Sequence, residues 1–318
     1  MTEPGDFAHD PVMRDEIVAT FAEVPAGVVL DATLGGAGHS RAILDSRPDL
    51  AILGIDRDPD ALAAAEARLA PYGARAMTYR ARFDQLEAAM AAHDVTELSG
   101  ALFDLGVSSH QLDAAERGFS YRHDGPLDMR MDADAGLGQT WSADDVVNGY
   151  DEARLADVIQ RYGDERFARR VAKAIVAARP IESTTELAAV VTAAIPAPAR
   201  RTGGHPAKRT FQAIRIEVNG ELDALPEALD AAIDALAPGG RLAVLAYHSG
   251  EDRIVKDRIR EAETGGCECP PELPCVCGAV KTVRIVRAPK RPSAAEQERN
   301  PRASSARYRV AEKLDRAS

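Results

Sequence analysis

The stretch Val28-Val29-Leu30-Asp31-Ala32-Thr33-Leu34-Gly35-Gly36-Ala37-Gly38-His39-Ser40 decides the fold. Its apolar start at residues 28–30 is typical of a parallel strand that is buried on both faces. The three glycines that follow allow a sharp turn and let a ligand approach the main-chain N–H groups. A strand, a glycine-rich turn and the start of a helix are typical of a nucleotide-type cofactor loop. A plain strand-to-helix connection could use the same residues, so both interpretations remain open at this point.

Three details of sequence indicate which cofactor such a loop would bind. A dinucleotide fingerprint needs a further glycine three positions after Gly38, where Arg41 stands. Asp31 lies at the end of the strand, where a carboxylate repels a pyrophosphate but suits the cationic S-adenosylmethionine. The next predicted strand ends at Asp56, from which a carboxylate can meet the hydroxyls of an adenosine ribose. The pattern therefore favours S-adenosylmethionine over NAD.

Composition indicates a soluble protein with room for about two domains. The chain has 318 residues, 45% of them hydrophobic, and no apolar run approaches the roughly 20 residues of a membrane span. Because the first residues are acidic and not those of a signal peptide, we expect a cytoplasmic protein without a membrane partner. The oligomeric state, monomer or homodimer, is left open.

The charge pattern is acidic overall and basic in patches. The formal net charge is −11, while basic residues gather at 166–170, 200–209, 281–291 and 299–309. This distribution favours a specific, structured RNA over indiscriminate phosphate binding. A solvated helix face would explain any single patch equally well.

The order of strands and helices predicts an α/β fold with a doubly wound parallel sheet and an inserted all-α subdomain. We expect the core in residues 1–109 and 213–318, and the insertion, a substrate-recognition subdomain, in residues 110–212. Two late strands are expected to join the sheet edge as an antiparallel pair. The predicted strands are 28–30, 51–55, 76–79, 100–105, 241–247, 282–287 and 306–311.

Helix signals dominate the insertion. Ser142 is a candidate cap for 143–148, Asp151 begins a helix, residues 164–179 are amphipathic, and Thr184 or Thr185 caps 186–195. After the insertion, the turn residues 238–240 are expected to end a helix before the strand 241–247.

The chain carries a series of long, irregular motifs: Asp31–Ser40, Asp56–Pro59, Asp104–Ser109, Gln111–Asp113, Glu116–Ser120, Gly125–Asp132, Arg209–Arg215, His248-Ser249, Glu251–Arg253 and Asn300–Arg302. These motifs are similar to those of the bacterial MraW-type methyltransferases, the family of ribosomal RNA small-subunit methyltransferase H. The similarity covers the chain from His9 nearly to its C-terminus. In two places the residues depart from the usual pattern. Ala246, Tyr247 and Gly250 stand where the family usually has serine, phenylalanine and leucine, and Lys208 stands where it usually has threonine.

This resemblance implies S-adenosylmethionine-dependent methylation of the N4 amino group of one cytidine in small-subunit (16S) ribosomal RNA. The partner would be that RNA or the assembling small subunit. The resemblance implies cofactor contacts at Ala37, Gly38, His39, Asp56, Phe83, Asp104 and Gln111. The glycine-rich loop adds Gly36 as a further candidate.

Methyl transfer to this amine needs positioning more than acid–base chemistry. The lone pair of a cytosine amine is delocalised into the ring, so an acceptor for one N–H would favour the transition state. Asp104, Ser108 and Ser109 are the candidates for that acceptor, and His248 could line the target pocket. Asp104 could equally anchor the cofactor, and His248 could simply begin a helix.

The cytidine is expected to leave its stack to reach the pocket. Phe119, Tyr121 and Met131 are candidates for holding the base, and Arg130, Arg209 and Arg253 for contacting phosphates. The alternative for Phe119 and Met131 is ordinary packing.

All four cysteines of the chain fall in one short segment, as Cys267, Cys269, Cys275 and Cys277. Four thiols are enough for a tetrahedral structural zinc site, although Cys-x-Cys is tighter than the usual Cys-x2-Cys. The alternative is a reduced surface loop.

Three rival functions are weighed against this interpretation. An amino-methyltransferase could act on DNA or protein, a dinucleotide oxidoreductase could use a glycine-rich loop, and a non-catalytic RNA-binding protein would need no such loop. Asp31 and Arg41 argue against the oxidoreductase.

Overall fold

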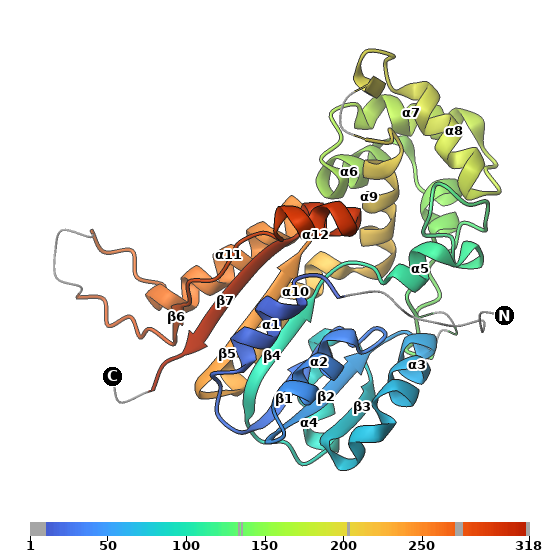
Figure 1. Cartoon of the computed structure of the whole chain (residues 1–318). Helices are drawn as coiled ribbons and strands as arrows, with labels where there is room; N and C mark the ends of the chain where they lie inside the picture. Colours follow the sequence, from blue (N-terminus) through green and yellow to red (C-terminus); the bar gives the residue numbers. More distant parts are fainter. Residues whose placement is uncertain (1–10, 133, 135, 202–203, 271–275, 316–318) are drawn as a thin grey trace. The chain divides into compact units, whose positions relative to one another are not determined.

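The computed structural model describes residues 11–132, 134, 136–201, 204–270 and 276–315. The chain forms two compact units: Met1–Gly106 with Leu222–Ser318, and Val107–Glu221 (Figure 1). The sequence-based boundaries of the insertion were 110–212. The second unit extends to Glu221 because helix α9 (Lys208–Asn219) packs against helix α6 (Glu152–Gly163) of the same unit.

The first unit contains a seven-stranded sheet in the order β3-β2-β1-β4-β5-β7-β6. Strands β1 to β5 run parallel, and β7 is antiparallel to both β5 and β6. The late antiparallel pair expected from the sequence is therefore present at the sheet edge. The strands are β1 Gly27–Asp31, β2 Leu50–Asp56, β3 Ala76–Arg80, β4 Leu98–Asp104, β5 Leu236–Ala246, β6 Val283–Ile285 and β7 Arg307–Lys313.

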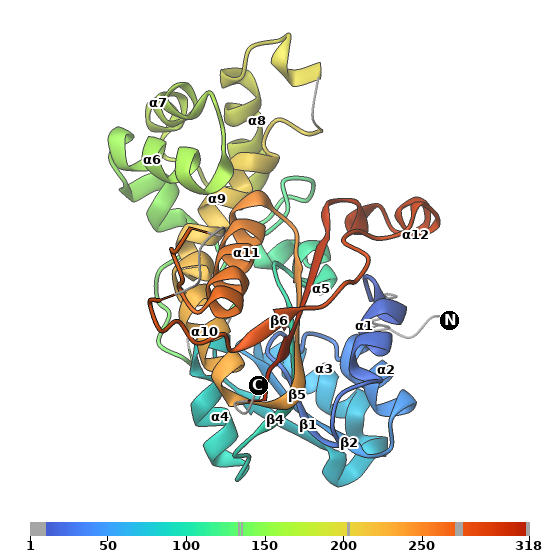
Figure 2. The same ribbon diagram turned by 90° about the vertical axis from the view of Figure 1, so that its left-hand side faces the viewer.

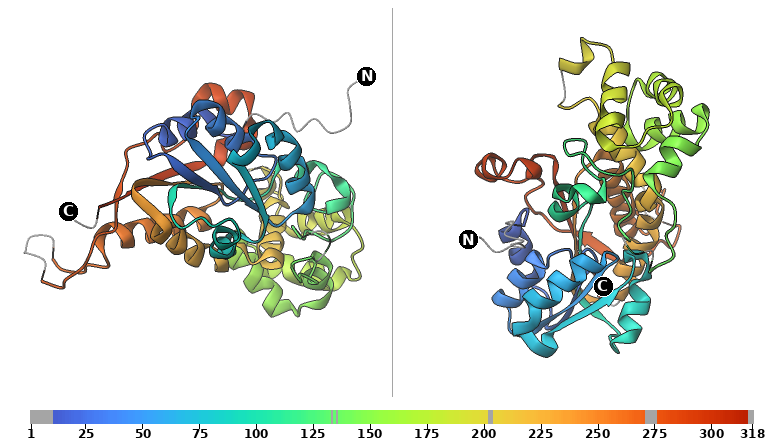
Figure 3. Two further views of the ribbon diagram at one scale, coloured as in Figure 1. Left: turned by 90° about the horizontal axis from the view of Figure 1, so that it is seen from below. Right: turned by 90° about the vertical axis from the view of Figure 1, so that its right-hand side faces the viewer.

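Helices cover both faces of this sheet, as Figures 2 and 3 show. The apolar residues of α1 (Arg14–Phe21), α2 (Gly38–Ser46) and α3 (Pro59–Leu69) pack on one face. Those of α4 (Leu86–Ala92), α10 (Glu221–Ala235) and α11 (Ser249–Thr264) pack on the other. The central strands are buried on both sides, as their apolar runs predicted. A short helix, α12 (Ala294–Arg299), precedes β7.

Strand β5 begins earlier than the sequence indicated. The turn residues 238–240 lie within it, and the register with β4 shifts between Leu98 and Gly100. The glycines and the proline at this point belong to an irregularity in the strand pairing. From the sequence alone, the same residues predicted the end of a helix.

The described residues of the second unit contain helices and no strand. Its α-helices are α5 Ser109–Asp113, α6, α7 Ala168–Ala178, α8 Thr184–Ala194 and α9.

Three helix starts in the second unit differ from expectation. Ser183, and not Thr184 or Thr185, caps α8, because its side chain accepts from the N–H of Glu186. Helix α7 starts at Ala168, since Asp164 adopts a left-handed conformation that ends α6. Ser142 donates to Asp145 ahead of a π-turn and does not cap a regular helix.

Candidate active site

The candidate site lies at the carboxyl ends of neighbouring strands, where the sheet order reverses between β1 and β4. Open α/β sheets bind ligands at such a switch point. Strands β1, β2 and β4 end in Asp31, Asp56 and Asp104 respectively. Three carboxylates at adjacent strand ends give this edge a negative charge that favours a cationic ligand.

The glycine-rich loop connects β1 to α2 in a tight backbone path. Gly35 has a φ of +49°, and Ala37, which precedes α2, has a φ of 57°, both in the left-handed region. At Gly38 an added Cβ would lie 2.5 Å from Cγ of Pro11, so glycine is required there by close packing. Helix α2 has no side-chain cap at its start, which leaves its first N–H groups available to a ligand.

Asp31 holds this loop in place. Its two carboxylate oxygens accept from the hydroxyl of Ser40 at 2.6 Å and from the N–H of Thr33 at 3.3 Å. Burial raises the pKa of Asp31, while the bond from Ser40 opposes that rise. Only 2% of Asp31 is exposed, so its carboxylate does not face a ligand. The sequence reasoning had expected the opposite.

Asp56 joins the loop to the second strand. Its carboxylate accepts from the N–H groups of Gly35 at 2.8 Å and Asp58 at 2.9 Å. Removal of this group from water raises its pKa to about 6, against the lowering effect of the two N–H donors. The carboxylate thus lies beside the loop and has a pKa of about 6, above the ordinary value of an aspartate.

Asp104 is held from two sides. The hydroxyl of Tyr247 donates to its Oδ1 at 2.7 Å, and Nε2 of His39 lies 3.4 Å from its Oδ2. Its own N–H donates to the hydroxyl of Thr33 at 2.7 Å. Burial and the neighbouring Asp104 charge raise the pKa of Tyr247 well above its ordinary value, so this hydroxyl remains a donor. The structure therefore brings His39 and Asp104 together, as expected, and adds Tyr247.

The sequence reasoning missed the role of Tyr247. The available signal was its place at the end of a predicted strand, in a motif where the family usually has phenylalanine. A hydroxyl at that position faces the neighbouring strand end, where Asp104 lies.

His248 begins helix α11. Its Nδ1 accepts from the N–H of Glu251 at 3.3 Å, and its Nε2 lies 3.0 Å from the Glu251 carboxylate. Glu251 is 2% exposed and also accepts from the N–H of Tyr247 at 2.7 Å. The structure thus shows His248 at the start of α11, and its place beside the target pocket stays a prediction.

Phe83 lies just after β3, at the start of a short 3₁₀ turn (Phe83–Gln85). It is half-buried and packs edge-to-face on the buried Phe103 of β4, with ring centroids 6.2 Å apart. Its ring is thus held rigidly at the same edge of the sheet.

Three further candidates, Ser108, Ser109 and Gln111, lie in the second unit. Ser108 and Gln111 form a reciprocal capping box at the start of α5: the N–H of Gln111 donates to the Ser108 hydroxyl at 3.2 Å, and the N–H of Ser108 to the Gln111 amide at 3.1 Å. Ser109 is the first residue of α5, and its side chain lies outside what the structure describes.

The candidate base-holding residues of the second unit divide into two groups. Phe119 and Met131 are 5% and 8% exposed, which favours ordinary packing for both. Tyr121 is half-buried and stacks on the ring of His205, with centroids 4.4 Å apart. Tyr121 therefore remains the aromatic candidate for stacking on a base.

The three arginines proposed to contact phosphates differ in the bonds that they already make within the protein. Arg130 is held by a bidentate pair with Asp128, at 2.7 and 2.9 Å, and Arg209 donates to the carbonyl of Asp164 at 2.9 Å. Arg253, in the first unit, is exposed.

The cysteine segment lies away from this edge, after the end of α11. The thiol sulfurs of Cys267, Cys269 and Cys277 lie within 4.8 Å of one another. Cys275 lies outside the described residues. The predicted four-thiol site is thus represented by three converging thiols.

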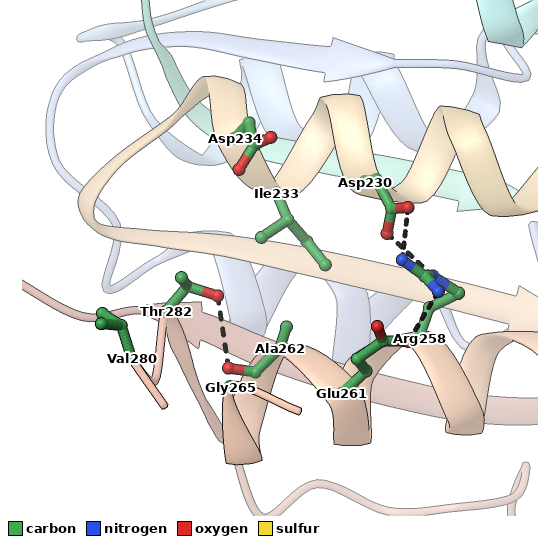
Figure 4. A pocket seen from close by; sticks show the side chains of 9 residues that line it. All are labelled: Asp230, Ile233, Asp234, Arg258, Glu261, Ala262, Gly265, Val280 and Thr282. Atoms are coloured by element: carbon green, nitrogen blue, oxygen red, sulfur yellow. Dashed lines mark hydrogen bonds and ion pairs between the residues drawn. The ribbon is translucent and has the colours of Figure 1, made fainter. Parts of the chain in front are cut away.

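A cavity of about 310 Å³ opens beside the same segment, between the second halves of α10 and α11 (Figure 4). It is lined in part by Arg258, whose guanidinium pairs with Asp230 and Glu261. Its lining includes none of the candidate site residues, and its one cationic side chain, Arg258, is already paired. We therefore do not assign the cofactor to it.

Comparisons with known proteins identify the family of the chain. Residues 6–314 match the model of the MraW methylase family. This chain belongs to the MraW methylase family. The methylase is 49% identical over 315 residues to the ribosomal RNA small subunit methyltransferase H of Heliobacterium modesticaldum, covering 97% of this chain and 99% of that one. The namesake from Symbiobacterium thermophilum is 49% identical over 315 residues, covering 97% of each.

Among solved structures, an rRNA methylase from Streptococcus thermophilus has a TM-score of 0.40 and 13% identity, covering 95% of this chain and 94% of that one. The MraW methylase has the class I methyltransferase fold, with five parallel strands and an antiparallel β7 between β5 and β6. No described helix of this methylase has both the length and the apolar character that crossing a membrane requires.

Proposed function

We propose that this MraW methylase transfers the methyl group of S-adenosylmethionine to the N4 amino group of one cytidine in small-subunit ribosomal RNA. The observation that carries the proposal is the edge formed by the glycine-rich loop, Asp56 and Asp104 in a chain of this family. The names of the relatives supply the substrate class. Acting on ribosomal RNA, the protein is expected in the cytoplasm.

The residues present fit a cationic adenosine cofactor. The imidazole of His39 is 6% exposed, and neither of its ring nitrogens makes a hydrogen bond among the described residues. Such a buried polar group beside the Asp104 carboxylate is a place where a ligand atom completes the bonding. Asp56 is placed to accept from ribose hydroxyls, and Phe83 offers an apolar ring to an adenine.

The remaining cofactor contacts are backbone groups and one amide. Gly36, Ala37, Gly38 and His39 would present N–H groups at the start of α2. Gln111, in the second unit, stays a contact predicted from the resemblance alone.

When bound, S-adenosylmethionine supplies an electrophilic methyl group on a sulfonium. The work of the protein is then to hold the amine in line and to accept one of its hydrogens as charge develops. We assign the acceptor role to Asp104, because Tyr247 occupies its Oδ1 while Oδ2 has only the longer contact to His39. Ser108, Ser109 and His248 remain secondary candidates.

The second unit is proposed to bind the RNA. The stacked pair of Tyr121 and His205 offers an aromatic surface for an unstacked base. The basic residues along α7, Arg169, Arg170 and Lys173, are the candidates for phosphate contacts.

The test uses the purified full chain, methyl-labelled S-adenosylmethionine and four acceptors: small ribosomal subunits, naked small-subunit RNA, DNA and bulk protein. We expect label in the RNA, in a single N4-methylated cytidine located by nucleoside mass mapping, with or without subunit proteins. Label confined to DNA or to protein would refute the substrate assignment.

The Asp104→Ala variant tests the acceptor. We expect transfer to be abolished while cofactor binding by calorimetry weakens by less than about tenfold. Wild-type turnover in this folded variant would remove Asp104 from the reaction. A loss of binding that accounts for all the lost activity would make Asp104 a cofactor anchor instead.

A further inference from the structure

The loop between α11 and β6 is closed at its base. Helix α11 ends at Thr264, and Gly265 follows with a φ of +66°. A Cβ at Gly265 would lie 2.5 to 2.7 Å from the backbone of Val280, so the two ends of the loop touch main chain to main chain. Thr282 then donates its N–H to the carbonyl of Ala262 at 2.9 Å, and its hydroxyl donates to the same carbonyl at 3.3 Å (Figure 4). The described residues 266–270 and 276–279 therefore leave and rejoin the fold at one point.

Three thiols converge in this closed loop. The sulfurs of Cys267, Cys269 and Cys277 all lie within 4.8 Å of one another, although the residues are half-buried or exposed. Structural cysteines without a ligand usually pack as small apolar residues in a core. Packing does not explain three thiols that gather near the surface, from both ends of a loop.

The geometry points to a zinc ion held by these three thiols: we propose that Cys267, Cys269 and Cys277 are ligands of a structural Zn²⁺. A tetrahedral zinc with Zn–S bonds of about 2.3 Å places its sulfurs about 3.8 Å apart. The observed sulfur–sulfur distances, none above 4.8 Å, exceed that spacing by at most about 1 Å. The site needs one further ligand, and Cys275 lies outside the described residues, so the assignment is made for the three described thiols alone.

Zinc is favoured over the other metals that thiolates bind. Iron–sulfur clusters are normally held by four cysteines, and the tight Cys-x-Cys pair leaves little room for a cluster. Zinc takes three thiolates with a fourth ligand of another kind and has no redox requirement.

The metal is assigned to the fold and not to the reaction. Helix α11 has 16 residues and separates His248 from the loop by roughly 24 Å. The ion would fix the path of the chain into β6 and the basic stretch Lys281–Arg291, in the same unit as the methyl-transfer edge. This inference goes beyond the proposed function and does not depend on it.

The first experiment is metal analysis of the full chain, purified without chelator. We expect about one zinc per chain. We also expect its release, followed with a zinc-sensitive dye, in step with mercurial titration of the thiols. Protein free of zinc that takes up none on addition of ZnCl₂ would overturn the assignment, as would iron or copper in its place or a disulfide among these cysteines in the intact mass.

The second experiment compares variants. Cys267→Ser and Cys269→Ser are each expected to lose at least tenfold in zinc affinity, while Glu268→Gln, which lies between the two thiols, keeps wild-type affinity. Cobalt substituted for zinc should give a thiolate-to-metal charge-transfer band that weakens in both serine variants. Full zinc binding by the double serine variant would overturn the proposal. Methyl transfer is not needed for any of these readouts.

Discussion

Tyr247→Phe tests whether the orientation of Asp104 limits methyl transfer. The change removes only the hydroxyl that donates to Oδ1 at 2.7 Å. A hydrogen bond to a charged group contributes about 1.5 to 3 kcal/mol. Asp104 is 27% exposed, and water can replace part of this bond, so we take the lower end. A loss of about 1.5 kcal/mol in the transition state lowers kcat about tenfold.

The assay is steady-state methyl transfer to small-subunit RNA, with the cofactor and the RNA varied separately. We expect kcat to fall while KM for the cofactor stays within about twofold, because the cofactor contacts of the loop are untouched. Since phenylalanine is the usual residue of the family at this position, the variant should fold normally.

Tyr308→Phe is the matched control. Its hydroxyl donates to the hydroxyl of Thr20, in α1 of the same unit, at 2.8 Å and not to a candidate site residue. This variant should lose some stability and keep wild-type kcat. The reasoning fails if Tyr247→Phe keeps wild-type kcat, or if its loss only follows a lower folded fraction.

Three further changes test other parts of the structure. Because the pKa of Asp56 is about 6, cofactor affinity should be constant above that pH and fall about tenfold per pH unit below it. Calorimetry on Asp56→Asn should show no such pH dependence. An equally steep curve in that variant would exclude Asp56 as the titrating cofactor contact. Ser40→Ala removes the 2.6 Å partner of buried Asp31 and should lower the free energy of unfolding by about 1 to 3 kcal/mol in urea titration; an unchanged midpoint would contradict this role. Asn219→Ala leaves two backbone groups of the 129–131 loop without their partner and should cost at least about 2 kcal/mol, whereas wild-type thermal unfolding would show that the loop does not need it.

The strands were predictable because a short run of consecutive apolar residues is enough to indicate a strand that is buried on both faces. Runs such as 51–55 and 100–103 are apolar on both faces and are each followed by an aspartate, so the sequence indicated the strand and the site position together. Helix starts were less certain where several capping residues adjoin, as at Ser183, Thr184 and Thr185. Only the backbone conformation decides which of them caps.

The orientation of the acidic side chains could not be predicted. Asp31 turns inward because Ser40, nine residues later, comes back to it through the loop. Tyr247 meets Asp104 because β4 and β5 are neighbours in the sheet, although a whole unit of chain separates them. Such contacts depend on tertiary pairing, which single-sequence patterns do not specify.

The discontinuous first unit also has a consequence for synthesis of the protein. Asp104 leaves the ribosome 143 residues before Tyr247, which is roughly 7 to 30 s at bacterial rates of translation. During that interval β4 has β1 on one side and no β5 on the other, so a strand whose apolar residues end up fully buried is an open edge. A nascent chain stalled between residues 107 and 235 is therefore the species most prone to aggregate, and the one on which a holding chaperone would act.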